Sequence, residues 1–306
     1  LINCASSHIY LKQMNRKCES ALENGAEPVR VLSSVLGQNY PSDELEYSWK
    51  KLMQNHPHDS ICCCSVDEVQ DEMATRFNKS KQVADYLVSE GTRYIADKIN
   101  TKEYEKYKNA LPFVVFNTTG RKRTSVVSVE IDVTRKSGWL KKCAYDLDEI
   151  NVPNYKLIDS AGNSIPFKIE DLGVRFGYDL PKDKFRQPYM ARRVRVTFEA
   201  ENISAVGYKT YALVEGDAEK VTDTLVSGEN CMENDAIRVE INKNGSLNVT
   251  DKASGRTYKG VAYYEETGDL GNEYMYKMPE GSKAITTQDT VAKIELAEDE
   301  PYRAMY

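Results

Sequence analysis

The periodicity of the chain changes at Leu111-Pro112-Phe113-Val114-Val115-Phe116-Asn117, just after Asn109. Upstream of this stretch, apolar residues recur at intervals of three and four, as on one face of an α-helix. Downstream, they alternate in steps of two, which is typical of strands with one buried face. The sequence therefore predicts an α+β multidomain protein, in which a helical bundle precedes antiparallel β-sandwich domains.

Helical spacing runs through most of residues 1–109, and a bundle of the three-helix type would bury its apolar stripes. One helix is predicted to begin at Ser42, after Pro41, and to end near Met53. A capping box, Ser65-Val66-Asp67-Glu68, precedes the longest helix, which extends to about Ile99 and which Gly91 is expected to bend. The stripes consist of Leu11, Met14, Cys18, Ala21, Leu22; Val29, Leu32, Val35, Leu36; Leu45, Trp49, Leu52, Met53; and Val69, Met73, Phe77, Ala84, Leu87, Val88, Tyr94, Ile95.

Alternating apolar residues mark several strands after Asn109. A hairpin turn of the primed type is predicted at Asn244-Gly245, because such a turn needs positive φ and these residues tolerate it. The polar stretch 215–230 divides a first β-sandwich region, residues 110–216, from a second at residues 217–306. The alternating positions are Val127, Val129, Ile131, Val133; Val194, Val196, Phe198; Ile237, Val239, Ile241; and Val291 or Ala292 through Leu296.

The composition argues against two classes of protein, those that bind nucleic acids and those that span membranes. The 306 residues are 41% hydrophobic and 29% charged, and the net charge of −6 comes from acidic and basic residues mixed along the chain. The sequence has no basic stripe for phosphates and no apolar run near the ~20 residues that span a bilayer, so we expect neither a nucleic-acid nor a membrane partner. The seven cysteines are an odd number without disulfide-framework spacing, which favours a reducing, cytoplasmic setting.

Most of the candidate chemistry lies in the turn Gln54-Asn55-His56-Pro57-His58-Asp59-Ser60-Ile61. Neutral imidazole with a neighbouring carboxylate is common in zinc sites, and a catalytic zinc takes three or four protein ligands and keeps one position open. This turn would supply one or two of them. The same pattern also serves as a helix-end cap or a packed ring, and spacing alone leaves both interpretations open.

Three adjacent cysteines, Cys62-Cys63-Cys64, follow the turn. Structural zinc sites usually place two to four residues between paired cysteines so that both sulfurs reach one ion, and adjacent cysteines fit this poorly. We therefore predict small, buried, reduced side chains at a tight turn. The alternative is a structural zinc module made of His56, His58 and the three cysteines.

The segment from Gln54 to Cys62, continued by Cys64-Ser65-Val66-Asp67-Glu68-Val69, closely resembles the His-Asp segment of bacterial glycoside hydrolase family 38 α-mannosidases. In that family an N-terminal α/β barrel precedes a helical bundle and β-sandwich domains. The resemblance implies that residues 1–109 are the bundle and that residues 217–306 begin the larger C-terminal sandwich. Other similar segments are Ile9-Tyr10-Leu11-Lys12-Gln13-Met14-Asn15, Ala26-Glu27-Pro28, Val115-Phe116-Asn117, Val206-Gly207-Tyr208-Lys209-Thr210-Tyr211 and Gly268-Asp269-Leu270-Gly271-Asn272-Glu273-Tyr274.

The resemblance also implies a zinc-dependent retaining α-mannosidase. Its Zn²⁺ would be held by a His-x-Asp pair and the nucleophilic Asp of the barrel, with one further His from the bundle, which by motif position is His58. Asp59 matches a residue that hydrogen-bonds mannose hydroxyls, Tyr274 matches a sandwich tyrosine that reaches the same sugar, and His56 would orient the loop. The implied partners are an α-mannoside oligosaccharide, the barrel of the same polypeptide and a second subunit in a homodimer.

Two departures from the family pattern affect this prediction. The glycine that is usual between the two cysteines is Cys63 here, so a positive φ at this position would strain the turn. The chain has only His8, His56 and His58, no His-x-Asp pair, and Leu as its first residue, so we expect an inactive C-terminal part of a longer polypeptide. The alternatives are a mannosylglycerate or phospho-mannosylglycerate hydrolase of the same family, and a carbohydrate-binding or structural module.

Overall fold

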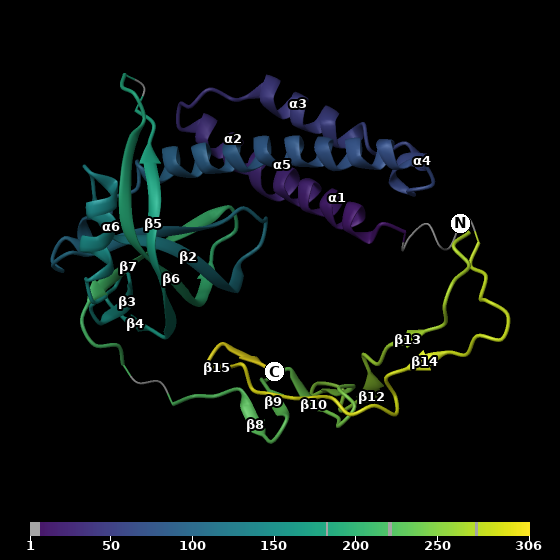
Figure 1. Ribbon diagram of the computed structural model, residues 1–306. Helices are drawn as coiled ribbons and strands as arrows, with labels where there is room; N and C mark the ends of the chain where they lie inside the picture. Colours follow the sequence, from purple (N-terminus) through teal and green to yellow (C-terminus); the bar gives the residue numbers. More distant parts are fainter. Residues whose placement is uncertain (1–6, 182, 220–221, 273–274) are drawn as a thin grey trace. The chain divides into compact units, whose positions relative to one another are not determined.

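Helices followed by antiparallel sheets confirm the predicted α+β class (Figure 1). The computed structural model describes residues 7–181, 183–219, 222–272 and 275–306. The chain divides into two compact units. The first comprises Leu1–Asn100, Thr118–Gly120 and Tyr264–Thr286, and the second comprises Thr101–Asn117, Arg121–Tyr263 and Thr287–Tyr306. A search of the described helices for a stretch able to cross a lipid bilayer finds none.

The helical part of the first unit is a bundle of three arms (Figure 1). One arm consists of α1 (Ile9–Ala21), the π-turn η2 (Leu22–Ala26) and α2 (Glu27–Val35). Pro28 has no amide hydrogen for the regular helical ladder, and the amide of Glu27 bonds the Leu22 carbonyl five residues back. The other arms are α3 (Ser42–Met53) and α5 (Asp67–Ala96), with the short α4 (His58–Ile61) between them.

An apolar core holds the three arms together, and most of its members belong to the predicted stripes. The prediction is wrong for Val35, Leu36 and Met53, which are exposed at the ends of α2 and α3. On α5, Met73, Phe77 and Ala84 are fully buried at helical spacing. Burying an apolar side chain of the size of Phe or Met contributes about 1.5–3 kcal/mol to folding. The buried members of the core are Leu11, Cys18, Leu22, Ala26, Leu45, Leu52, Cys63, Met73, Phe77, Ala84 and Leu87.

The capping box predicted at Ser65 is wrong. The N-cap of α5 is Val66, an extended residue with φ −66° and ψ 158°, and no described side chain caps the helix at that position. The Ser65 hydroxyl is buried without a hydrogen-bond partner among the described residues. The side chain of Gln70 holds this helix start instead, because its amide donates to the carbonyls of Cys63 (3.3 Å) and Ser65 (3.0 Å).

Gly91 allows α2 to pack closely against α5, which continues through this glycine to Ala96. A Cβ added to Gly91 would lie 2.6 Å from Val29 Cγ1 and 3.1 Å from Arg30 Cδ. Val29 is buried and β-branched, so few other rotamers are open to it. The absence of a side chain at position 91 is therefore a packing requirement.

We expect Gly91→Ala to lower the free energy of unfolding of the bundle by about 1 kcal/mol. Overpacking costs about 1–3 kcal/mol, and the better helix propensity of Ala returns at most about 1 kcal/mol. Hydrogen exchange of the α5 amides measures the change. The control is Ser89→Ala, an exposed position of the same helix, which should leave exchange unchanged or slower. Equal exchange in the two variants would contradict the packing role.

Two antiparallel sheets of the second unit form a sandwich (Figure 1). One sheet has the order β1-β7-β3-β4, with β1 at Leu111–Asn117, β7 at Gly207–Glu215, β3 at Tyr155–Asp159 and β4 at Ser164–Ile165. The other has the order β2-β6-β5, with β2 at Arg123–Lys136, β6 at Gln187–Ile203 and β5 at Phe167–Asp179. The unit also contains the 3₁₀-turn η3 (Lys102–Tyr104) and the helix α6 (Leu140–Asp148).

The sandwich core follows the predicted alternation. Val194, Val196 and Phe198 on β6 are fully buried, and the intervening Arg193 and Arg195 form ion pairs outside the core. The Phe198 ring contacts the Tyr211 ring edge-on, with 4.8 Å between their centroids. Buried residues from both sheets meet here: Tyr155, Leu157, Val194, Val196, Phe198, Ala200, Ile203, Tyr211 and Leu213.

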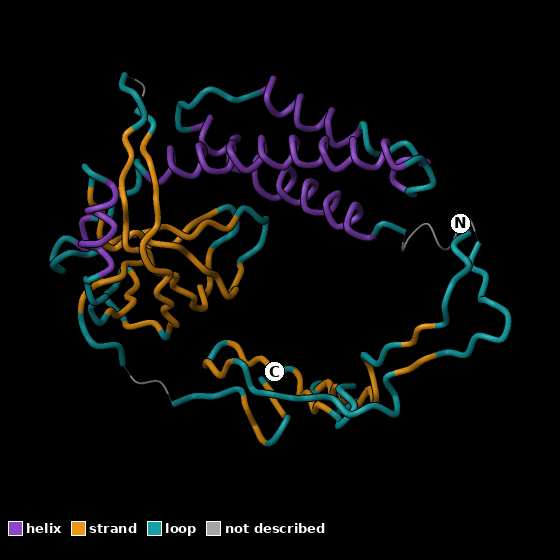
Figure 2. Tube along the Cα trace, viewed as in Figure 1, coloured by secondary structure: helices purple, strands orange, loops and turns teal. Residues whose placement is uncertain are grey.

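The remaining strands form smaller antiparallel sheets separated by long loops (Figure 2). The strand predicted over residues 291–296 is wrong, because residues 287–297 form no strand. The contacts of this stretch with neighbouring segments include the hydrogen bond from the Ala292 amide to the Lys243 carbonyl (2.8 Å), which is not part of a strand ladder. The strands are β8 (Val226–Gly228), β9 (Cys231–Glu233), β10 (Ile237–Ile241), β11 (Leu247–Asp251) and β12 (Thr257–Val261) in one sheet, and the pairs β13 (Glu265–Glu266) with β14 (Ile285–Thr286) and β15 (Glu298–Glu300) with β16 (Arg303–Met305).

The hairpin between β10 and β11 forms, but the predicted primed turn is wrong. The Asn242 amide bonds the Ser246 carbonyl (2.8 Å), so the loop has three residues, and the Gly245 amide bonds the Asn242 carbonyl (2.8 Å). Gly245 has φ 83°, whereas φ of Asn244 is not positive. A three-residue loop that ends in a left-handed glycine is the next commonest hairpin connection.

Candidate functional site

The turn after α3 consists of two short backbone segments that meet at Pro57. The His56 amide bonds the Met53 carbonyl (3.0 Å), which closes the end of α3. Pro57 has φ −48° and ψ 137°, an extended conformation that redirects the chain and starts α4. Its carbonyl accepts hydrogen bonds from the amides of Ser60 (2.9 Å) and Ile61 (3.1 Å). His58 and Asp59 therefore occupy the first turn of α4.

Contacts with two other helices, α5 and α1, fix this turn. Asn55 is fully buried, and its Nδ2 donates to the Met73 carbonyl of α5 (3.0 Å). His56 Nε2 lies 2.7 Å from Asn15 Oδ1 on α1, so the ring of His56 ties the turn to that helix. Because both contacts come from the bundle, the bundle determines the position of the residues that follow.

His58 and Asp59 form the exposed part of the turn. Their side chains are 86% and 69% exposed, and His58 Nε2 lies 3.2 Å from Asp59 Oδ1. Cys64 Sγ lies 3.6 Å from the same carboxylate oxygen. The arrangement presents an imidazole and a carboxylate together, on a rigid support and in contact with solvent.

The donor atoms fit part of a zinc site. Imidazole nitrogen and carboxylate oxygen are both zinc ligands, and a zinc site needs three or four of them. The described residues contain no group of three or more His, Cys, Asp or Glu side chains that could hold a metal ion. The alternative of a structural zinc module at His56, His58 and the cysteines therefore finds no ligand cluster in the described part of the chain. Zinc at His58 would need further ligands from elsewhere.

The three cysteines differ in burial. Cys63 is 6% exposed and accepts a hydrogen bond from Lys12 Nζ of α1 (3.1 Å), whereas Cys62 and Cys64 are partly exposed. Cys62 and Cys63 are free thiols, as predicted, but of the three cysteines only Cys63 is buried. The contact with Lys12 adds a second tie between α1 and the turn.

The expected strain at Cys63 is confirmed. This residue has φ 63°, in the left-handed region that disfavours every residue with a Cβ. The neighbouring Cys62 has φ −71° and ψ −17°, an ordinary helical conformation. The turn thus has a glycine-like conformation at a position that carries a side chain.

Variants at these two cysteines should respond in opposite ways. We expect Cys63→Gly to be more stable than Cys63→Ala by about 1 kcal/mol, because both remove the thiol and only Ala keeps a Cβ at positive φ. At Cys62 the order should reverse, with Ala better than Gly by about 0.5–1 kcal/mol. Urea unfolding followed by circular dichroism at helix wavelengths gives both differences. The same order at both positions would refute the strain.

Sequence reasoning missed the residues that support the turn. The side-chain contacts that hold the turn in place are made by Lys12, Asn15, Asn55 and Gln70. None of these residues belongs to a recognisable ligand pattern. A polar residue directly before the His-Pro-His motif was the one available signal for Asn55. Tyr274, predicted to bind substrate, lies outside the described residues.

A helical bundle that carries an exposed His-Asp turn, followed by an antiparallel sandwich, corresponds to the middle and C-terminal domains of an α-mannosidase-type glycoside hydrolase. Residues 2–95 match the family description "Alpha mannosidase middle domain". Residues 108–215 match "Glycosyl hydrolases family 38 C-terminal domain 1". The chain belongs to glycoside hydrolase family 38, and it contains these two domains of the family.

Similar proteins support this assignment. The chain is 40% identical over 314 residues to a protein named "Putative mannosylglycerate hydrolase" from Halalkalibacterium halodurans, covering 98% of this chain and 34% of that protein. It also resembles the crystal structure of an alpha-mannosidase from Enterococcus faecalis V583, at 40% identity and a TM-score of 0.93 over 99% of this chain and 34% of that one. A second Enterococcus faecalis structure, of a protein in glycosyl hydrolase family 38, gives 39% identity and a TM-score of 0.92 over 99% of this chain and 36% of that one. The chain thus spans about a third of the length of these relatives.

Proposed function

We propose that this chain is part of a zinc-dependent retaining α-mannosidase that removes terminal α-linked mannose from oligosaccharides. The observation that carries the proposal is the exposed His58-Asp59 pair on a turn fixed by the bundle, in a chain that belongs to this hydrolase family. His58 would donate one ring nitrogen to Zn²⁺, and Asp59 would accept hydrogen bonds from mannose hydroxyls. When bound, zinc supplies a Lewis acid that polarises substrate oxygens.

We infer that the catalytic carboxylates belong to parts of the polypeptide outside this chain. Retaining glycosidases use two carboxyl groups about 5–5.5 Å apart, one as nucleophile and one as acid and base. Because the chain spans about a third of its relatives, we infer that it positions His58 and Asp59 for a site completed by another domain. Taken alone, the 306 residues should hydrolyse no mannoside.

This chain would contribute to the site by holding the His58 imidazole and the Asp59 carboxylate in fixed positions. Asn55, His56 and Lys12 hold the turn against α5 and α1, so the exposed imidazole and carboxylate lose little conformational freedom when a sugar or an ion binds. A rigid helical support of this kind places binding groups more precisely than a free loop does. Asp59 would then contribute to binding and orientation of the sugar ring.

A second candidate is hydrolysis of mannosylglycerate, which the name of the Halalkalibacterium relative favours. The test is an assay of the full polypeptide with an aryl α-mannoside, an α-linked mannose disaccharide and mannosylglycerate, with the anomer of the released mannose followed by NMR. The proposal expects hydrolysis of the first two with retention of configuration. Hydrolysis of mannosylglycerate alone supports the second candidate, and inversion of configuration refutes both.

A non-catalytic carbohydrate-binding module is the remaining alternative, and a titration distinguishes it. As a module, the 306-residue chain would bind mannose oligosaccharides by itself, and His58→Ala would leave that binding unchanged. As part of an enzyme, the chain alone should bind them weakly, since one imidazole and one carboxylate provide few of the contacts that a sugar site needs. Isothermal titration calorimetry measures either result.

A further inference from the structure

A cavity of about 410 Å³ lies in the second unit, beside the strands β6 and β7. Its polar lining comes from separate segments: Glu199 and Glu201 of β6, Lys209 and Tyr211 of β7, Asp159 at the end of β3, and Asp223 of the loop after β7. Small-molecule sites typically enclose about 300–1,000 Å³, so a ligand of the size of one sugar ring fits this volume.

The buried Tyr211 provides a hydrogen-bond donor at this cavity. The residue is only 3% exposed, and its ring is held between Phe198 (centroids 4.8 Å apart) and Phe113 (5.9 Å). Burial raises the pKa of Tyr211 to about 12, so the hydroxyl keeps its proton at neutral pH. The hydroxyl makes no hydrogen bond to another described residue. Tyr211 lines the cavity, so its hydroxyl can donate a hydrogen bond to an oxygen atom of a ligand there.

Carboxylates dominate the rest of the lining. Glu199 and Glu201 form no ion pair and no side-chain hydrogen bond with other described residues, and burial together with the Glu201 charge raises the pKa of Glu199. Asp159 and Asp223 add two more carboxylates, against the single ammonium of Lys209. Two like charges on one strand disfavour each other, and a cation between them would stabilise both. The cavity therefore favours a positively charged ligand.

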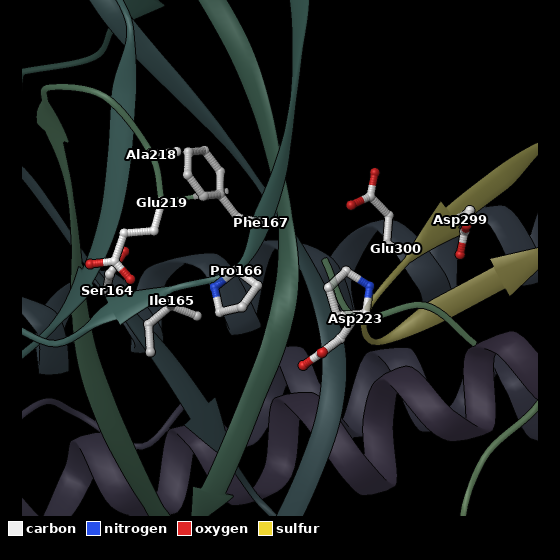
Figure 3. A pocket seen from close by; sticks show the side chains of 10 residues that line it. Ser164, Ile165, Pro166, Phe167, Ala218, Glu219, Asp223, Asp299 and Glu300 are labelled. Atoms are coloured by element: carbon white, nitrogen blue, oxygen red, sulfur yellow. The ribbon is translucent and has the colours of Figure 1, made fainter. Parts of the chain in front are cut away.

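A neighbouring hollow of about 210 Å³ has the same character (Figure 3). The two cavities have five lining residues in common: Ser164, Ile165, Pro166, Asp223 and Pro301. Figure 3 shows that its other acidic side chains come from opposite sides: Glu219 from the loop after β7, and Asp299 and Glu300 from β15. The excess of carboxylates thus continues beyond the first cavity.

A metal ion does not fit this arrangement, because the described residues contain no group of three or more carboxylate, His or Cys side chains able to hold one. An organic cation can bridge more widely spaced carboxylates. We propose that the cavity binds a small polyhydroxylated amine, of which an amino sugar is the simplest type. Its ammonium group would lie between Glu199 and Glu201, and its hydroxyl oxygens would accept hydrogen bonds from Tyr211 and Lys209. The proposal does not rest on the hydrolase activity.

Titration calorimetry of the full polypeptide with glucosamine tests the proposal, with glucose as a neutral probe that differs at one ring substituent. We expect glucosamine to bind at least about tenfold more tightly than glucose, because a hydrogen bond to a charged group contributes about 1.5–3 kcal/mol and 1.4 kcal/mol is tenfold. Glu199→Gln should weaken glucosamine binding about tenfold or more. Tyr211→Phe, which keeps the packed ring, should weaken it about fivefold.

The control is Glu149→Gln, an exposed carboxylate at the end of α6, which should leave glucosamine affinity unchanged. A thermal melt of each variant verifies that it is folded, and the two cavity variants make the test independent of either one. Equal affinity for glucose and glucosamine, undiminished affinity in Glu199→Gln, or no glucosamine binding at all would each overturn the proposal.

Discussion

Replacing His58 by alanine in the full polypeptide is expected to lower kcat/KM for α-mannosides by more than about 100-fold and to reduce bound zinc well below one ion per chain. Mutation of a residue that merely orients a zinc ligand already costs about 10- to 100-fold, and loss of a ligand should cost more. The ring of His58 is 86% exposed and contacts the neighbouring Asp59, so the variant should fold normally. Steady-state kinetics and metal analysis on the same preparation measure both effects.

The matched control is His56→Ala, two residues away. His56 contacts Asn15 of α1, so its loss should loosen the turn and lower activity by less than about tenfold, with zinc retained. Equal losses in the two variants would show that the turn matters only as a structural support. Full activity and full zinc content in His58→Ala would exclude His58 as a ligand.

Phe198→Ala is expected to destabilise the sandwich by about 3–5 kcal/mol, the usual cost of removing a fully buried aromatic ring. Phe198 contacts the rings of Tyr211 and Phe113, so the deletion leaves a hole at the point where the two sheets meet. Hydrogen exchange of the β6 amides should become faster by about 10²- to 10⁴-fold. The α5 amides, which belong to the other unit, should exchange as before.

Phe176→Ala is the matched control, because it deletes the same atoms from the same sandwich at a position that is 51% exposed. Exposed substitutions usually change stability by no more than about 0.5 kcal/mol. If Phe176→Ala and Phe198→Ala accelerate exchange equally, the inward-facing alternation of β6 does not determine the stability of this sandwich.

Much of the architecture followed from periodicity. The alternation of Val194, Val196 and Phe198 predicted the buried face of β6, and the helical stripe through Met73, Phe77 and Ala84 predicted the buried face of α5. Both patterns survive in the structure because long, regular elements bury one face, and a single misplaced residue does not change the pattern.

The local predictions failed where one tertiary contact outweighed a local preference. The capping box predicted at Ser65 does not form. Instead, the side-chain amide of Gln70 donates hydrogen bonds to two backbone carbonyls at the start of α5. The two-residue primed turn predicted at Asn244-Gly245 is replaced by a three-residue loop. In this loop the Asn244 side chain accepts hydrogen bonds from the amide (3.1 Å) and the hydroxyl (2.7 Å) of Ser246. Short motifs specify a preference of about 1 kcal/mol, which one buried contact can exceed.

The sequence predicts one part of the candidate sites, the His58-Asp59 turn, and does not predict the other, the cavity around Tyr211. The His58-Asp59 pair is contiguous in sequence, so its residue types pointed to it directly, and the glycine-like position of Cys63 could be anticipated from the family pattern. The cavity around Tyr211 could not be predicted from the sequence, because its residues come from segments far apart in the chain and belong to no motif. Folding alone brings Glu199, Asp159 and Tyr211 together.

The most direct test of the zinc assignment is anomalous diffraction at the zinc absorption edge from crystals of the full polypeptide. Our account expects one anomalous peak about 2.0–2.1 Å from a ring nitrogen of His58. A zinc peak whose ligands do not include His58, with that ring still turned toward solvent, would contradict it.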